Sequence, residues 1–410
     1  MRIVLFFCFV CVGMCLHAQQ KSDTLDLNEA VKQIMGSKDP EKQGSGTSIL
    51  PAIGYNPTFG LMLGATLTGG KTLGNPATTT LSTGTFTGFI TTKGIINVQL
   101  RHNVFTENNT WNFQGNAQIS KMVLLDYGLG TYAGQGYREG LSINQYTLDN
   151  NEAVYPIKFN YIRIFEKVYK KISKTLMVGA GVAIDNHFSI SDTKLQLDSG
   201  KFTPHYNYSI ANGFNPKKYW TNGFMLNIQY NTREHPNRPH GGLYADIAFR
   251  INPKLLGSTK FSSQLMTEFR KYISLSPRNP EHVIAFWHLG TYNLGGVLPY
   301  LDLPGTGTDM YNRSGRAYTI GRFRGPSYFY LESEYRFPIT ANKFLSGVVF
   351  ANMQSIADAE NKNLFNGWNP GAGMGLRILF NRSTRTNICI DYAFGVSGAN
   401  GLFFGLNEVF

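Results

Sequence analysis

Apolar and polar residues alternate along most of this chain. In the stretch 111–120, WNFQGNAQIS, Trp111 and Phe113 share one face, while Asn112 and Gln114 share the other. The same period of two recurs in IINVQLR (95–101), FMLNIQYN (224–231) and LYADIAFR (243–250). This period is typical of β-strands that have one apolar face and one polar face. The pattern therefore predicts an all-β fold.

The length and number of the alternating runs distinguish a membrane barrel from a soluble sandwich. The runs are about 9 to 14 residues long, and about fifteen of them lie between Thr58 and Phe410. Strands of soluble sheets usually have about 5 or 6 residues, whereas a tilted bilayer crossing takes about 9 to 11. We predict a transmembrane antiparallel β-barrel over residues 49–410. Because bacterial barrels have an even number of strands, we expect sixteen.

The first residues have the layout of a cleaved secretory signal. Arg2 precedes an apolar run from Ile3 to about Leu16, and the small residue Ala18 follows. Residues 1–18 are therefore predicted to be a signal peptide. Together with the predicted barrel, this signal predicts the outer membrane of a Gram-negative bacterium as the location.

Residues 19–48 are predicted to form a short periplasmic segment. Asp26 and Glu29 have the spacing of a capping box, and Gly36 can end a helix. We therefore expect a short N-terminal helix near 26–36.

Composition and charge narrow the possible functions. The chain has 44 Gly, 29 Phe and 22 Tyr but only 16% charged residues, which suits strands. The formal net charge of +12 favours contact with anionic lipid, and since no basic run is present, no nucleic acid partner is expected. The histidines lack metal-ligand spacing and no GxSxG motif occurs, so we expect no metal, no cofactor and no enzymatic reaction.

Several connections and aromatic residues fit the anatomy of an outer-membrane barrel. Three long, polar, Gly/Asn/Pro-rich connections are expected to be extracellular loops: 133–153, 190–217 and 295–326. Four aromatic residues near run ends are expected at the membrane interfaces: Trp220, Trp287, Tyr292 and Trp368.

The stretch 401–410, GLFFGLNEVF, alternates large apolar residues with smaller ones. Phe404, Leu406 and Phe410 are expected to face lipid and to form the C-terminal signal that outer-membrane assembly machinery reads. We expect this strand to close the barrel against a first strand near 58–67.

The stretch 315–337, GRAYTIGRFRGPSYFYLESEYRF, resembles the BamA/TamA family of outer-membrane assembly and translocation barrels. That family has an Arg-Gly-aromatic motif in a long sixth extracellular loop, a Glu on the following strand and a Phe-x-Asp motif one strand later. The corresponding residues here are Arg316, Tyr318, Glu334 and Asn352. The resemblance implies that the loop folds into the lumen and is held there by these residues.

The alternation independently points Glu334 and Asn352 into the lumen, where Arg316 can reach them. Two positions depart from the family pattern, because Ala317 replaces Gly and Asn352 replaces Asp. The second change removes an anion, so we expect the contact to be weaker or rebuilt, and Asn352→Asp to tighten it.

An alternative register of the motif uses Arg322, Arg324 and Gly325. It keeps the glycine but places Pro326 where the aromatic residue belongs. The plainer interpretation of Arg322 and Arg324 is ordinary pore-lining charge.

The resemblance implies a barrel that helps to insert or translocate outer-membrane proteins or lipids through a weak seam between its first and last strands. The family receives clients on polypeptide-transport-associated (POTRA) domains, and residues 19–48 are too few to form one, so the chain looks like a barrel-only member. Expected partners are outer-membrane lipid, unfolded barrel proteins or lipids as clients, and an outer-membrane lipoprotein or periplasmic accessory subunit. The alternative is a passive pore or structural barrel whose seam stays closed.

Overall fold

The computed structural model describes residues 45–56, 60–134, 141–143, 146–147, 154–310, 312–358, 363–382 and 384–410, together with Leu27. The predicted signal peptide lies outside these residues, and so does the predicted helix near 26–36 apart from Leu27.

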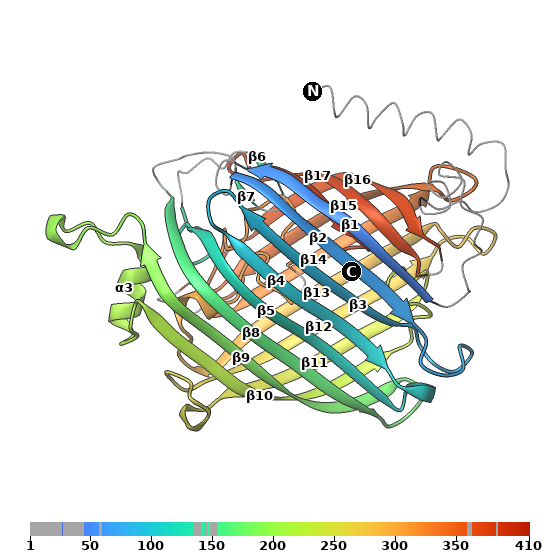
Figure 1. Ribbon diagram of the computed structural model, residues 1–410, viewed down its shortest axis with the longest axis horizontal. Helices are drawn as coiled ribbons and strands as arrows, with labels where there is room; N and C mark the ends of the chain where they lie inside the picture. The colour runs from blue at the N-terminus through green and yellow to red at the C-terminus, as the bar shows by residue number, and fades with distance from the viewer. Residues whose placement is uncertain are drawn as a thin grey trace.

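The described strands form one sheet of eighteen strands (Figure 1). Their bounds are β1 (Ser45–Asn56), β2 (Gly60–Lys71), β3 (Ser82–Thr91), β4 (Ile96–Phe105), β5 (Trp111–Asp126), β6 (Leu141–Ile143), β7 (Tyr146–Thr147), β8 (Tyr155–Lys171), β9 (Leu176–Asp192), β10 (Lys218–Asn231), β11 (Gly242–Asn252), β12 (Ser262–Ser274), β13 (Val283–Gly296), β14 (Tyr328–Pro338), β15 (Leu345–Ile356), β16 (Asn369–Asn381), β17 (Thr386–Gly395) and β18 (Asn400–Leu406).

The strands pair almost entirely in chain order. Each strand from β1 to β5 pairs antiparallel with the next, β5 pairs antiparallel with β8, and each strand from β8 to β18 again pairs antiparallel with the next. The short strands β6 and β7 lie in the connection from β5 to β8 and pair with each other. β6 also pairs with the start of β18, in parallel. The predicted all-β antiparallel architecture is thus confirmed.

The sheet curls round on itself, so that β2 to β5 face the viewer in Figure 1 while β13 to β15 pass behind them. On β10, Leu226 and Ile228 are 66% and 55% exposed on the outer face. Asn227 and Gln229, between and beside them, are buried on the inner face. A soluble sheet would bury the apolar residues instead, so this reversed arrangement suits a sheet that faces lipid.

The first strand differs from the sequence-based prediction. The expected strand near 58–67 overlaps β2, and a further strand, β1, precedes it and pairs with it along its whole length. The sequence of β1, SGTSILPAIGYN, contains Pro51 and Gly54 and lacks a regular apolar and polar alternation. The sequence of β1 therefore does not show the apolar and polar alternation by which a strand is predicted. The sheet begins at Ser45 rather than at residue 49.

Because neighbouring strands are antiparallel, the connections between them lie alternately at the two ends of the sheet. We call the end with connections 127–154, 193–217 and 297–327 the loop end. The opposite end, with connections 232–241 and 382–385, is called the turn end.

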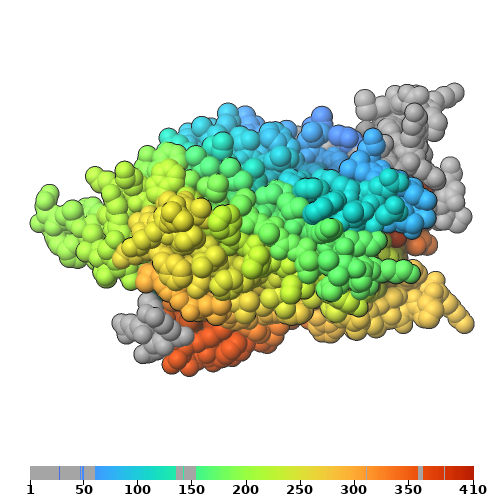
Figure 2. Space-filling view, turned by 90° about the horizontal axis from the view of Figure 1, so that it is seen from below, coloured from blue at the N-terminus to red at the C-terminus, as the bar shows by residue number. Residues whose placement is uncertain are grey.

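Connection 193–217 contains α3 (Pro204–Ala211) and projects beyond the loop end in both Figure 1 and Figure 2. The hydroxyl of Thr203 caps this helix by accepting a hydrogen bond from Tyr206 N at 3.2 Å. The described residues also contain the 3₁₀ turns η2 (Leu197–Ser199), η3 (Lys254–Leu256) and η4 (Tyr300–Asp302), and the turn η1 (Glu107–Asn109), in which Asn108 has a left-handed φ angle of 57°. Among the described residues, no helix is both long and apolar enough to cross a membrane.

Side chains fill much of the interior of the sheet. One buried cluster joins Trp287 of β13 and Tyr330 of β14 with Tyr318, from connection 297–327, and with Phe410. This connection therefore lies inside the curled sheet, where it can contact several strands at once.

Candidate functional site: an arginine held among interior carboxylates

Connection 297–327 is fixed to opposite walls of the sheet. On one side, Asn116 Nδ2 of β5 donates to the main-chain oxygen of Met310 at 3.0 Å. On the other side, Thr306 Oγ1 donates to Gln354 Oε1 of β15 at 2.8 Å. The connection therefore bridges the interior.

Arg316 of this connection contacts three carboxylates. Its Nη1 donates to Asp391 Oδ2 of β17 at 2.8 Å. Its Nη2 donates to Glu332 Oε1 and Glu334 Oε1, both on β14. The guanidinium also lies over the ring of Phe350, with Cζ 3.5 Å from the ring centroid. We call Arg316, Glu332, Glu334 and Asp391 the arginine cluster.

The period of two explains why the carboxylates converge. Glu332 and Glu334 are two residues apart on β14, so both side chains point to the same interior face. Arg316 and the three acids are all buried. Removing one partner from a buried ion pair costs about 3 to 5 kcal/mol, because the remaining charge is left uncompensated. Loss of any one member of the arginine cluster is thus expected to be costly for the connection.

Two further arginines share these carboxylates. Arg377 Nη1 of β16 donates to Asp391 Oδ1 at 2.5 Å. Arg336 Nε of β14 donates to Glu334 Oε2 at 2.8 Å. The planar fork of an arginine can contact two carboxylates at once, which lets the wall and the connection share the same acids.

Glycines on β16 provide the space for these groups. A Cβ atom at Gly375 would lie 1.8 Å from Asp391 Oδ1. A Cβ atom at Gly371 would lie 2.8 Å from Asn352 Oδ1 and 3.1 Å from the main-chain oxygen of Arg316. The sequence GAGMG (371–375) therefore serves close packing inside the sheet.

Ala317 occupies the motif position where the family has glycine. Its φ angle is 104°, in the left-handed region that L-residues adopt at a cost of about 1 to 2 kcal/mol. Its side chain is fully buried. The contacts of its neighbours Arg316 and Tyr318 hold the backbone in this conformation.

Tyr318 anchors the motif on the side of β16 and β17. Its hydroxyl donates to the main-chain oxygen of Pro370 and accepts from Val396 N, the latter at 3.0 Å. A Cβ atom at Gly395 would lie 2.5 Å from the Tyr318 ring, so this glycine makes room for the aromatic side chain.

Asn352 differs from the role expected of it. It does not contact the guanidinium; its Nδ2 donates to the main-chain oxygen of Arg316 at 3.0 Å. It lies opposite Glu332 in the register of β14 and β15. A carboxylate here would lose the donated hydrogen bond and would lie opposite Glu332 in the register, so the structure favours a looser connection in Asn352→Asp instead of the tighter one expected from the sequence.

The residues of the alternative register, Arg322, Arg324 and Gly325, have partners at the loop end in the structure. Arg322 Nη1 donates to the main-chain oxygen of Ala133 at 2.6 Å, and Arg324 Nη1 donates to the main-chain oxygen of Tyr300 at 2.9 Å. A Cβ atom at Gly325 would lie 2.1 Å from the main-chain oxygen of Ala357, so this glycine serves packing at the loop end.

Sequence reasoning missed four charged residues of the site: Glu332, Arg336, Arg377 and Asp391. Glu332 and Arg336 lie two positions before and after Glu334 on β14 and share its face, which is the signal that could have found them. Asp391 supplies the second anion that Asn352 lacks, from β17 instead of β15. The sequence marks Asp391 only by the fact that no other acidic residue occurs on β17.

The predicted C-terminal signal residues lie in two environments. Phe404 of β18 is 50% exposed on the outer face, and Leu406 ends the strand. Phe410 is only 3% exposed and stacks on Trp287, with ring centroids 5.3 Å apart. The expectation that Phe410 faces lipid is therefore wrong, because the chain leaves β18 after Leu406 and turns inward. Trp287, expected in an interface girdle, is its interior partner.

Another buried acidic residue, Asp302, lies near the start of connection 297–327, away from the arginine cluster. Asp302 accepts a hydrogen bond from Thr221 Oγ1 at 2.6 Å and lies 3.3 Å from His187 Nδ1. Burial, assisted by the negative charge of Asp185, raises the pKa of the Asp302 carboxyl to about 7. Deprotonation of this carboxyl is therefore expected to weaken the attachment of the connection at this point.

The sheet curls with its polar residues inside, and an arginine holds a connection in its interior. These two features define the class of membrane β-barrels that carry a loop inside the barrel. The model of the Omp85 superfamily domain matches residues 103–403. The chain therefore belongs to the Omp85 superfamily and is an outer-membrane β-barrel of this family.

Solved structures of two kinds are similar to the chain. BamA from Haemophilus ducreyi lacking POTRA domains 1–3 matches with a TM-score of 0.52 at 14% identity, covering 90% of this chain and 70% of that one. CdiB from Escherichia coli matches with a TM-score of 0.52 at 9% identity, covering 88% of this chain and 60% of that one. At such identities the likeness concerns the fold. No curated protein sequence matches the chain.

Proposed function

We propose that this barrel helps to insert or translocate outer-membrane proteins or lipids through a seam between β1 and β18. The observation that carries the proposal is the contact of Arg316 with Asp391 and with the two acids of β14. It ties the interior connection to β17, the neighbour of β18. The connection is thereby attached to the wall directly beside the proposed seam.

β18 is suited to detachment. It has only 7 residues, whereas β8 and β9 have 17 each. A strand held by few hydrogen bonds can leave its neighbour and expose an edge, to which a client strand can then pair.

The proposal includes closure of the sheet by pairing of β1 with the part of β18 that follows Leu402, which β6 leaves free, giving sixteen spanning strands with β6 and β7 outside that number. β1 runs from the turn end to the loop end, and β18 runs back, so the two strands have the directions that antiparallel neighbours need. We place the turn end in the periplasm, where the polypeptide partners of such a barrel would arrive.

A disulfide across the seam tests this function. Pairs of cysteines, one on β1 and one on β18, are introduced into the full chain on a Cys389→Ser background. Under oxidising conditions in cells, the crosslink is expected to stop assembly of other outer-membrane proteins or lipids, and reduction is expected to restore it.

The matched control crosslinks β2 to β3 at Thr66 and Thr87, whose hydroxyl oxygens are 3.2 Å apart. This crosslink leaves the seam free and is expected to have no effect on assembly. If the seam crosslink is equally harmless, the protein is a passive pore or structural barrel, and the proposed function is wrong.

We further propose that the protein catalyses no chemical reaction and works with a partner, either an outer-membrane lipoprotein or a periplasmic subunit. Affinity purification from the native membrane tests the second point. A stoichiometric subunit is expected to accompany the barrel, and purification of the barrel alone would contradict this expectation.

A further inference from the structure

The segment 407–410 leaves the sheet at Asn407, whose φ angle is 66°. Beyond this turn, Glu408 is only 2% exposed and points into the interior. Arg313 of connection 297–327 holds the segment by donating to the main-chain oxygens of Leu406, Glu408 and Val409. The segment is thus built into the interior as a direct continuation of β18.

Glu408 connects strands from different parts of the wall. Its Oε2 accepts from Arg377 Nε of β16 at 2.7 Å, and its Oε1 accepts from Asn387 Nδ2 of β17 at 2.8 Å. Its Oε1 also lies 3.8 Å from Arg238 Nε. Arg238 belongs to connection 232–241, between β10 and β11, at the turn end.

Connection 232–241 extends across the turn end to the β16–β17 turn. Asn237 Nδ2 donates to the main-chain oxygen of Thr384 at 2.9 Å. Arg385 Nη1 lies 3.3 Å from Glu234 Oε1 and donates to the main-chain oxygen of Arg238 at 3.2 Å. The connection therefore lies over the mouth of the sheet rather than beside its own strands.

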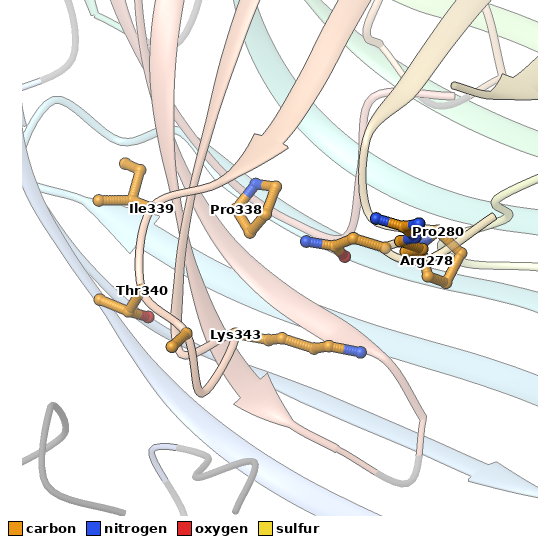
Figure 3. A pocket seen from close by; sticks show the side chains of 8 residues that line it. Arg278, Pro280, Pro338, Ile339, Thr340 and Lys343 are labelled. Carbon is orange, nitrogen blue, oxygen red and sulfur yellow. The ribbon is translucent and has the colours of Figure 1, made fainter. Parts of the chain in front are cut away.

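Arg238 is buried and has a second acid partner, Glu281, whose Oε2 lies 2.9 Å from Arg238 Nη2. Glu281 also lies 3.5 Å from Lys343 Nζ. Lys343 lines a pocket of about 330 Å³ between the turns 275–282 and 339–344, which Figure 3 shows from close by. Connection 232–241 is thus held from both sides of the mouth.

These contacts form one continuous series of charged groups through the interior. Arg316 pairs with Asp391, Asp391 with Arg377, and Arg377 with Glu408. Glu408 then faces Arg238, at the turn end. Glu408 is the member of this series that moves if β18 moves.

We propose that Glu408 couples the seam to the periplasmic mouth: when β18 detaches, Glu408 withdraws from Arg238, which leaves Arg238 with Glu281 as its acid partner and loosens connection 232–241 at the turn end. This inference rests on the proposed function, since it assumes a seam that can open. Opening of the seam would then also open a route from the periplasm, so that a client strand enters the lumen only when β18 is displaced.

Hydrogen–deuterium exchange of the full-length protein in lipid nanodiscs tests the coupling. Glu408→Gln is expected to accelerate amide exchange in 232–241 by about 5-fold to 150-fold, the usual range of coupling between sites. Because coupling is reciprocal, Arg238→Gln is expected to accelerate exchange in β18. The double variant is expected to fall short of the sum of the two single effects, since the contact between Glu408 and Arg238 is lost only once.

Asp185→Asn is the matched control. Asp185 is also buried and paired with two arginines, Arg163 at 2.8 Å and Arg250 at 3.0 Å, but it lies on β9 away from segment 407–410. It is expected to leave exchange in 232–241 unchanged. Equal acceleration by Asp185→Asn, or additive effects in the double variant, would overturn the coupling.

The seam crosslink separates this inference from the proposed function. If both hold, the crosslink slows exchange in 232–241 and also stops client assembly, whereas the Thr66–Thr87 crosslink does neither. A crosslink that stops assembly without slowing exchange removes the coupling and keeps the function. A crosslink that slows exchange without affecting assembly keeps the coupling and removes the function.

Discussion

Arg316 Nη1 lies 2.8 Å from Asp391 Oδ2, although the two residues are 75 positions apart in the chain. This contact joins the middle of connection 297–327 to β17, the last strand before β18. An arginine in this position is matched by acids on two strands, so the connection is held where the wall is nearest to the proposed seam.

Arg316→Ala is expected to lower the free energy of unfolding by about 3 to 5 kcal/mol, because three buried carboxylates lose a shared cation. Arg316→Lys is expected to recover only part of this loss, since an ammonium cannot form the planar fork. The gel-shift melting temperature of unboiled samples measures both. Arg324→Ala, which alters the same connection away from the carboxylates of the arginine cluster, is the comparison, and an equal effect there would contradict the special role of Arg316.

Asn352→Asp is expected to loosen connection 297–327 by about 1 to 3 kcal/mol. The new carboxylate cannot donate to the main-chain oxygen of Arg316 and adds a charge opposite Glu332. Protease access to 297–327 in intact cells reports the loosening. Tighter protection in this variant would show that the added anion pairs with the guanidinium after all.

Phe410→Ala is expected to destabilise the barrel by about 3 to 5 kcal/mol, as is usual when a buried Phe is truncated. Phe404→Ala removes the same atoms from a side chain that is 50% exposed on the outer face, so its effect is expected to be smaller. Thermal melting of the two purified variants in one detergent gives the comparison. Equal losses would mean that Phe410 contributes no more than an outward-facing residue.

The pKa of Asp302 predicts an effect of pH on stability. Burial raises this pKa to about 7 from 3.8, so the folded state favours the protonated carboxyl. Its contribution to stability is complete below pH 3.8 and is lost as the pH rises through 7. Melting at pH 5.5 and pH 8.5 should therefore differ by about 1 to 2 kcal/mol. Asp302→Asn should remove that difference, and its persistence would assign the effect to another group.

The sequence predicted the membrane sheet well because its signal is repeated in strand after strand. Even the interior side of Glu334 followed from its distance to Tyr330 and Arg336 along one strand. Counting positions along a strand predicts the face of a side chain as long as the backbone stays extended.

What the sequence could not predict depends on where the chain stops being extended. Phe410 is in phase with Phe404, and only the turn at Asn407 reverses its environment. Similarly, the partner of Arg316 on β17 depends on how far the connection descends, which no period within one strand encodes. β1 was missed for a third reason, because Pro51 and Gly54 interrupt its pattern.

The glycines of β16 have a consequence for mutational tolerance. At Gly375, adding one methyl group places a carbon 1.8 Å from Asp391 Oδ1. At outward positions such as Met374, which is 63% exposed, many apolar side chains of different sizes fit equally well. Natural variation at the inward positions of this strand is therefore expected to be limited by side-chain volume. At the outward positions in between, it is expected to be limited by hydrophobicity. Gly375→Ala should therefore destabilise the barrel more than Met374→Phe.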